Sequence, residues 1–141
     1  MSILYKELSY DVVGAAIAVW KNFSLGHKEY IYQQALEEEF KNRNILYIQE
    51  PGIKIFSSIT KKFMGLYRPD FFIENKIIVE LKIQLFPIRR IWDQIYQYLR
   101  NSECQLASLI NFSPSGLTAK RIIYTNDKKE TDITTTTKGH E

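Results

Sequence analysis

The stretch RPDFFIENKIIVELK, residues 68–82, decides the fold. It holds two apolar runs, FFI and IIV, on either side of an Asn-Lys pair that is typical of a turn. We therefore predict a hairpin whose second strand is apolar enough to be central in a sheet. Asp70 stands before the first run, and Glu80 follows the second, with Lys82 two residues on. If the two strands pair antiparallel through this turn, Asp70 should lie across from Glu80 or nearby. Because side chains two apart in a strand share a face, Lys82 should lie beside Glu80.

Two carboxylates and an ammonium group are thus expected to converge at one edge of a sheet. Neighbouring carboxylates repel each other unless a proton or a cation intervenes. A divalent ion such as Mg²⁺ relieves the repulsion, because it binds a few oxygens and keeps several waters. The lysine could orient or activate a water, or stabilise developing charge on a phosphate. For these three residues taken alone, a salt-bridged surface is the alternative.

Hydropathy along the rest of the chain predicts an α/β fold, a single domain with a central mixed β-sheet flanked by helices. Apolar residues at helical spacing predict helices over residues 10–23 and 27–43, and a third from Pro87 to about 101. Apolar and alternating runs predict strands over 45–49, 53–58, 76–83, 104–112 and 119–124, and one extended stretch over 63–74. The strand, helix and strand within 76–112 form a crossover unit, which should make its two strands parallel.

The composition narrows the class of protein. Residues 1–124 form the predicted domain, and residues 125–141 are expected to be a disordered polar tail, because they are almost without apolar residues. The net charge of +3 permits nucleic-acid binding without requiring it. The single cysteine excludes an internal disulfide and a cysteine-rich zinc or iron–sulfur site. We expect a cytoplasmic protein that does not bind a membrane, since no apolar run reaches about 18 residues and the start does not resemble a secretory signal.

Two predicted helices carry polar side chains that share a face. Glu29 and Tyr32 follow Gly26 with the spacing i and i+3, and Gln94 and Tyr98 have the spacing i and i+4. Each pair also has a purely structural interpretation. A first-turn carboxylate favours the helix dipole, and a glutamine and a tyrosine one turn apart can be ordinary helix surface.

In this order and at these gaps, the pieces GHKEYIY, YRPD, VELK and QIYQY resemble the small GxxExxY proteins. Those proteins belong to the PD-(D/E)XK nuclease superfamily, on the branch with RecB-like nuclease domains. The resemblance spans about residues 5–124. It implies a restriction-endonuclease-like core and a metal-dependent nuclease, a hydrolase acting on ester bonds, that cleaves phosphodiester bonds in DNA with Mg²⁺ or Mn²⁺.

The resemblance assigns catalytic roles residue by residue. Glu29 matches the helix acid that completes the metal site, and Asp70 matches the aspartate of the PD element. Glu80 and Lys82 match the E-x-K element, in which the glutamate binds metal together with the carbonyl of Leu81. The metal ligands are then Glu29, Asp70 and Glu80, and Lys82 positions or activates the attacking water.

The remaining roles concern nucleic acid. Gln94 and Tyr98 match the Q-x-x-x-Y element, which contacts DNA and supports the lysine in RecB-like relatives. Contacts with nucleic acid are also expected from Tyr32, Arg68, Arg89 and Arg90, with His27 as a further phosphate contact. For the basic residues, a plain surface role is an equal alternative.

Two other functions stay open. The chain could be a non-catalytic module that binds nucleic acid or a protein partner on the same scaffold. It could also be a dimeric junction-resolving nuclease, with Phe63, Met64, Phe86 and Trp92 supplying a dimer face unless they are core residues. The chain lacks the cysteines of iron–sulfur relatives and the fused helicase of larger ones, and both departures leave the substrate and the partners open. A homodimer or a larger protein assembly is among the alternatives.

Overall fold

The structure is a computed structural model that describes residues 3–84 and 89–130. The elements of this part are α1 (Lys6–Phe23), α2 (Glu29–Asn42), β1 (Tyr47–Gln49), β2 (Ile53–Phe56), β3 (Phe63–Tyr67), β4 (Phe71–Ile73), β5 (Ile77–Lys82), α3 (Arg89–Arg100), β6 (Leu106–Ser113) and β7 (Gly116–Ile123). Five strands form a mixed sheet in the order β1-β4-β5-β6-β7, and β2 and β3 form a separate hairpin. The predicted α/β class with a mixed central sheet is confirmed. None of the described helices is long and apolar enough to cross a membrane.

The predicted hairpin at the centre of the sequence is present as β4 and β5. The amide of Lys76 donates to the carbonyl of Ile73 at 2.8 Å, and the two residues between them, Glu74 and Asn75, both have positive φ. This is the form of a type I′ turn, whose twist matches that of the paired strands. Phe71 pairs with Val79 in this antiparallel hairpin, so the same register places Asp70 opposite Glu80.

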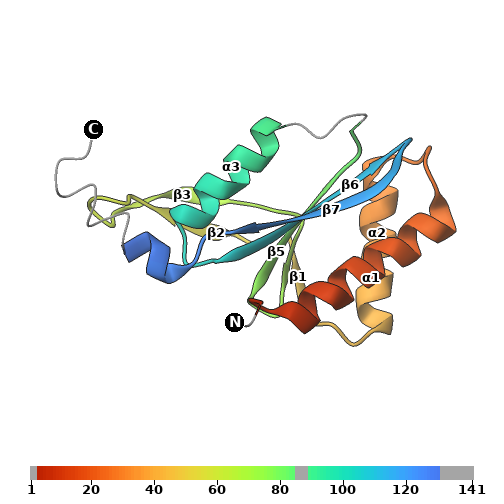
Figure 1. The fold of residues 1–141 in the computed structure, drawn as a ribbon, viewed down its shortest axis with the longest axis horizontal. Coiled ribbons are helices and arrows are strands. Elements are labelled where there is room, and N and C mark those ends of the chain that lie inside the picture. The colour runs from red at the N-terminus through yellow and green to blue at the C-terminus, as the bar shows by residue number, and fades with distance from the viewer. Residues whose placement is uncertain (1–2, 85–88, 131–141) are drawn as a thin grey trace.

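The crossover from β5 through α3 to β6 makes β5 and β6 parallel, as predicted. Helices α1 and α2 cover one face of the sheet, and α3 lies on the other (Figure 1). The larger core cluster joins α1 and α2 to the sheet, and the smaller joins α3 to the sheet and to Ile53 and Tyr67 of the β2–β3 hairpin. Every residue of β6 is buried, as expected of a strand covered on both faces.

The predicted single extended stretch over residues 63–74 is wrong. The chain divides there into β3, which pairs with β2, and β4, which pairs with β1 and β5. Pro69 lies at the break, and a proline has no N–H group with which to continue a ladder of hydrogen bonds. The β2–β3 hairpin lies on the same side of the central sheet as α3 (Figure 1).

The expected disorder from residue 125 is wrong for the part of this segment that the structure describes. Residues 126–130 are helical, and the side chain of Lys129 donates to the carbonyls of Ser102 and Cys104 at 2.7 and 2.6 Å. Polar residues here gain order through hydrogen bonds to the loop before β6, which their composition does not reveal. Residues 131–141 and the predicted helix start at Pro87 lie outside the described residues.

Candidate active site

Asp70 is held from two directions at the start of β4. Its Oδ2 atom accepts a hydrogen bond from the backbone amide of Leu81 at 2.7 Å, and its Oδ1 atom accepts one from Nε2 of Gln33 at 3.0 Å. The first bond comes from the neighbouring strand β5 and the second from helix α2. The carboxylate is therefore fixed between the sheet and the helix that covers one of its faces.

Glu80 lies on β5 and is held by a tyrosine from the β2–β3 hairpin. The hydroxyl of Tyr67 donates to Oε2 of Glu80 at 2.7 Å. The ring of Tyr67 is buried and stacks on the ring of Tyr98, with centroids 4.0 Å apart and planes inclined by 17°. Gln94 donates to the hydroxyl of Tyr98 at 3.2 Å. The Gln94–Tyr98 pair thus reaches the carboxylates through Tyr67, whereas the resemblance implied support of Lys82.

Glu29 reaches the same region from the first turn of α2. The loop before this helix is fixed by Tyr32, whose side chain is fully buried. The Tyr32 hydroxyl donates to the carbonyl of Ser24 and accepts from the amide of His27, and its ring packs edge-on against Phe112. The expectation that Tyr32 contacts nucleic acid is therefore wrong. Its ring belongs to the core, and its hydroxyl closes the loop that positions Glu29.

Burial raises the pKa of each of the three carboxyl groups, Glu29, Asp70 and Glu80, above the usual value for its residue type. The charge of Asp70 raises the pKa of Glu29 and of Glu80 further, so the acids repel one another. The hydrogen bonds from Leu81 and Tyr67 act in the opposite direction, on Asp70 and Glu80 respectively. The positive charge of Lys82 lowers the pKa of each of the three acids. Lys82 is therefore electrostatically coupled to all three acids.

The three acids do not form a compact metal cage as they stand. Among the described residues, no group of three or more His, Cys, Asp or Glu side chains is arranged to hold a metal ion. The amide of Gln33 lies between two of the acids, because its Nε2 atom is 3.0 Å from Asp70 and 3.5 Å from Glu29. The predicted set of Glu29, Asp70 and Glu80 is therefore only partly assembled. The donors nevertheless suit Mg²⁺, which binds a few carboxylate oxygens and retains waters.

The predicted arginines lie at the surface. Arg68, Arg89 and Arg90 are exposed, and Arg89 forms a loose ion pair with Asp93 at 3.9 Å. Arg68 immediately precedes Pro69 and Asp70 in the chain, whereas the other two begin α3. Their role in binding nucleic acid stays a prediction.

Sequence reasoning missed two residues of the site, Gln33 and Tyr67. Gln33 is four residues after Glu29, a spacing that places both on one face of α2. Tyr67 precedes Asp70 by three residues, but its contact with Glu80 depends on how the β2–β3 hairpin folds against the sheet. Only Gln33 could therefore have been found from the sequence, through its spacing from Glu29.

Comparisons with known proteins found a family model and solved structures that are similar to this chain. The family model described as PD-(D/E)XK nuclease superfamily matches residues 6–122. The crystal structure of the protein SSO0001 aligns with a TM-score of 0.51 and 22% identity, over 96% of this chain and 64% of that one. This chain thus spans less than two thirds of that protein. An alkaline exonuclease from Laribacter hongkongensis aligns with a TM-score of 0.47 and 10% identity, over 99% of this chain and 82% of that one. No curated protein sequence matches. With most of its length matched by the family model, the chain belongs to the PD-(D/E)XK nuclease superfamily.

Proposed function

We propose that this chain is a divalent-metal-dependent nuclease that hydrolyses phosphodiester bonds in DNA. We place it in the GxxExxY group, on the RecB-like branch. The observation that carries the proposal is the pair of partly buried carboxylates, Asp70 and Glu80, on adjacent strands and within the electrostatic reach of Lys82. Membership of the nuclease superfamily supports it.

Asp70 and Glu80 are the residues that would hold a Mg²⁺ or Mn²⁺ ion, together with the Leu81 carbonyl and with Glu29 as the third acid. The bound ion would supply Lewis acidity and lower the pKa of water. The chain itself contributes positioning. The Leu81 amide and the Tyr67 hydroxyl fix the two carboxylates.

Lys82 would act on the substrate side of the site. Its ammonium group can orient the attacking water or stabilise the charge that develops on the phosphate. Arg68, Arg89 and Arg90 would contact phosphates farther along the nucleic acid, so binding should weaken steeply with salt. Gln94 and Tyr98, on α3, would support Tyr67 and through it Glu80.

Labelled linear, nicked, single-stranded and branched DNA, incubated with and without Mn²⁺, tests the proposal. We expect cleavage that requires the divalent ion and that falls about 100-fold or more in Lys82→Ala and in Asp70→Asn. Lys41→Ala is the matched control, because this exposed lysine lies in the last turn of α2, at the opposite end of the helix from Glu29. Equal cleavage by the wild type and by Lys82→Ala would refute the mechanism.

One observation favours a second candidate, a non-catalytic nucleic-acid-binding module. The described residues hold no ready group of three metal-binding side chains. Isothermal titration with Mn²⁺ separates the two candidates. A nuclease should bind the ion and lose this binding in Glu80→Gln, whereas a non-catalytic module should bind nucleic acid without binding the ion.

A further inference from the structure

The β2–β3 hairpin and its flanking residues carry only positive charge. Between Pro51 and Pro69 the sequence contains no Asp or Glu, although the whole chain has 16 such residues. The same segment has four basic side chains, Lys54, Lys61, Lys62 and Arg68, and all four are exposed. The hairpin is therefore a basic arm whose own sequence supplies no compensating carboxylate.

Large apolar side chains are exposed among these basic groups. Ile59, Phe63, Met64 and Leu66 each expose at least half of their surface. The two kinds of side chain are adjacent in the sequence, because Lys61 and Lys62 directly precede Phe63 and Met64. Ammonium groups and apolar surfaces are thus presented together by one short stretch.

The base of the hairpin is tied to the candidate active site. Tyr67, the last residue of β3, bonds to Glu80 and stacks on Tyr98. The hairpin is also anchored near its turn, where Phe56 pairs with Phe63 and its amide donates to the carbonyl of Asn101, just after α3, at 2.7 Å. Phe63 lies four positions before Tyr67 along β3, a distance of about 13 Å. One end of β3 therefore contacts the candidate active site, and the other end carries the exposed Phe63.

The turn at the far end of the hairpin is also ordered. The side-chain oxygen of Ser57 accepts hydrogen bonds from the amides of Ile59 and Thr60, both at 3.1 Å. The amide of Ser57 donates to the carbonyl of Lys62 at 2.8 Å. These bonds hold the turn that presents the two lysines and Phe63, so the backbone that carries the exposed groups is fixed before any partner binds.

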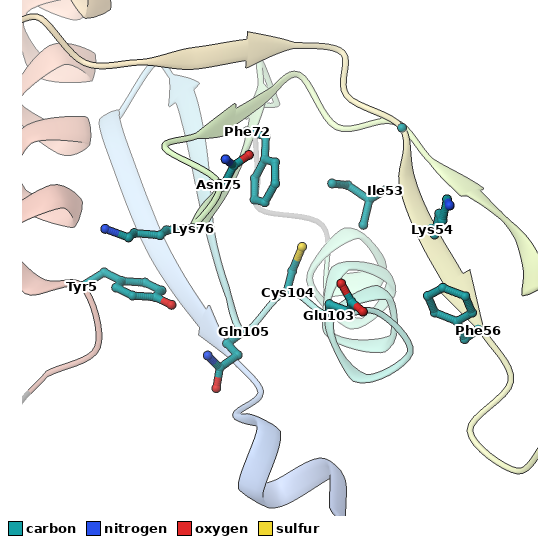
Figure 2. A pocket seen from close by; sticks show the side chains of 11 residues that line it. Tyr5, Ile53, Lys54, Phe56, Phe72, Asn75, Lys76, Glu103, Cys104 and Gln105 are labelled. Carbon is teal, nitrogen blue, oxygen red and sulfur yellow. The ribbon is translucent and has the colours of Figure 1, made fainter. Parts of the chain in front are cut away.

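A cavity of about 580 Å³ lies at the base of the hairpin (Figure 2). Lys54 and Phe56 of β2 line one side of it, and Phe72 and Lys76 line the other. Glu103 adds a carboxylate to this lining. The cavity places further lysines and aromatic rings beside β2, at the end of β5 that lies away from Glu80.

The combination of groups indicates the chemical class of the ligand. Lysines with no neighbouring carboxylate in their own segment favour a polyanion, and exposed aromatic and apolar side chains favour contact with the faces of bases. A duplex keeps those faces stacked inside, whereas an unpaired strand exposes them.

We propose that the β2–β3 hairpin binds an unpaired nucleic-acid strand that leads to the candidate active site. Its lysines contact phosphates, and Phe63 and Met64 contact bases. This inference deepens the proposed function, on which it rests, by naming the substrate class.

Fluorescence anisotropy with a labelled oligothymidine and with a blunt DNA duplex, both in EDTA, tests the inference. We expect the wild type to bind the single strand more tightly. In Lys61→Gln/Lys62→Gln, binding should weaken and the slope of log K against log salt should become shallower by about 1.4, or about 0.7 for each phosphate that the variant no longer neutralises. In Phe63→Ala, binding of the strand should weaken roughly tenfold with an unchanged slope.

Matched controls come from α1, which covers the opposite face of the sheet (Figure 1). Lys6→Gln/Lys21→Gln removes two exposed lysines, and Tyr10→Ala removes an aromatic ring that is 77% exposed. We expect both control proteins to bind the strand as the wild type does. Equal weakening of binding in the controls and in the hairpin variants would overturn the inference, as would unchanged binding by the hairpin variants or tighter binding of the duplex.

Cleavage of the same DNA, measured in parallel with Mn²⁺, separates this inference from the proposed function. If the wild type cleaves DNA and the hairpin variants bind and cleave normally, the role of the hairpin is refuted and the nuclease stands. If binding depends on the hairpin but no substrate is cleaved, the nuclease is refuted and the hairpin site stands. A wild type that neither binds nor cleaves any of these DNAs refutes both.

Discussion

The hydroxyl of Tyr67 donates a 2.7 Å hydrogen bond to Glu80, and this bond joins the β2–β3 hairpin to the central sheet. It stabilises the ionised form of Glu80, whose pKa burial otherwise raises. Burial and the charge of Glu80 in turn raise the pKa of Tyr67 well above its usual range, so the phenol remains a donor. The hairpin therefore fixes a residue that the proposed mechanism needs in its ionised form.

Tyr67→Phe should impair catalysis while leaving the fold intact. The variant keeps the ring that stacks on Tyr98 but removes the hydrogen bond that holds Glu80. Partners that orient metal ligands typically contribute about 10- to 100-fold to metal affinity or activity. We expect the rate of DNA cleavage to fall by a factor in this range, with a higher Mn²⁺ concentration needed for half of the maximal rate.

The chain offers a matched control for this substitution. Tyr47 also donates to a glutamate, Glu37, at 2.7 Å, but it pairs with Ile73 at the other end of β4 from Asp70. Tyr47→Phe removes the same kind of bond away from the candidate site and should leave cleavage unchanged. If Tyr67→Phe cleaves DNA at the wild-type rate and with the wild-type requirement for Mn²⁺, the bond to Glu80 has no part in catalysis.

Gln33→Leu should also reduce cleavage. The substitution keeps a side chain of similar size but removes the amide that donates to Asp70 at 3.0 Å and lies 3.5 Å from Glu29. A hydrogen bond to a charged group contributes about 1.5–3 kcal/mol. If most of this free energy serves to position Asp70 for the reaction, the rate of cleavage should fall roughly 10- to 100-fold when the bond is lost.

Gln34→Leu is the control for helix α2, because Gln34 is the exposed neighbour of Gln33. It should cleave DNA as the wild type does. Circular dichroism and thermal unfolding of both variants test whether the fold persists. Wild-type cleavage by Gln33→Leu would show that the glutamine only fills the space between the two acids.

Local signals predicted the central part of the fold well. Two apolar runs with a turn between them predicted β4 and β5, and the strand–helix–strand order predicted the parallel pair of β5 and β6. The alternation of side chains along β5 then placed Glu80 and Lys82 on one face. These features depend on residues close in the sequence, and such features can be read without tertiary information.

The errors concern residues whose surroundings come from distant segments. Tyr32 follows Glu29 by three residues, but packing against Phe112 of β6 buries its ring in the core. Tyr67 lies in a stretch that resembles one long strand, and only the separation of β3 from β4 brings it to Glu80. Helical spacing identifies which residues share a face, but not what that face contacts.

Divalent cations should stabilise the protein, and more so at alkaline than at acidic pH. Burial raises the pKa of Glu29, Asp70 and Glu80. Between the usual and the raised pKa values the folded state binds more protons than the unfolded chain, so without divalent ions the free energy of unfolding should fall as the pH rises. A cation that binds the ionised groups offsets this decrease. Mn²⁺ at a concentration about 100 times its Kd stabilises by about 2.7 kcal/mol, which corresponds to a rise in Tm of roughly 10 °C.

The rise in Tm should shrink as the pH falls through the raised pKa values, because protons then compete with Mn²⁺ for the same oxygens. Thermal unfolding at several pH values, with Mn²⁺ or with EDTA, measures it. Glu80→Gln should abolish most of the effect, since it removes one charged ligand while retaining an oxygen that can accept from Tyr67. Glu38→Gln, at an exposed position on α2, should show the same rise in Tm with Mn²⁺ as the wild type. A rise in Tm that is the same in Glu80→Gln as in the wild type would mean that the cation binds elsewhere, and Glu80 would then no longer be assigned as a ligand.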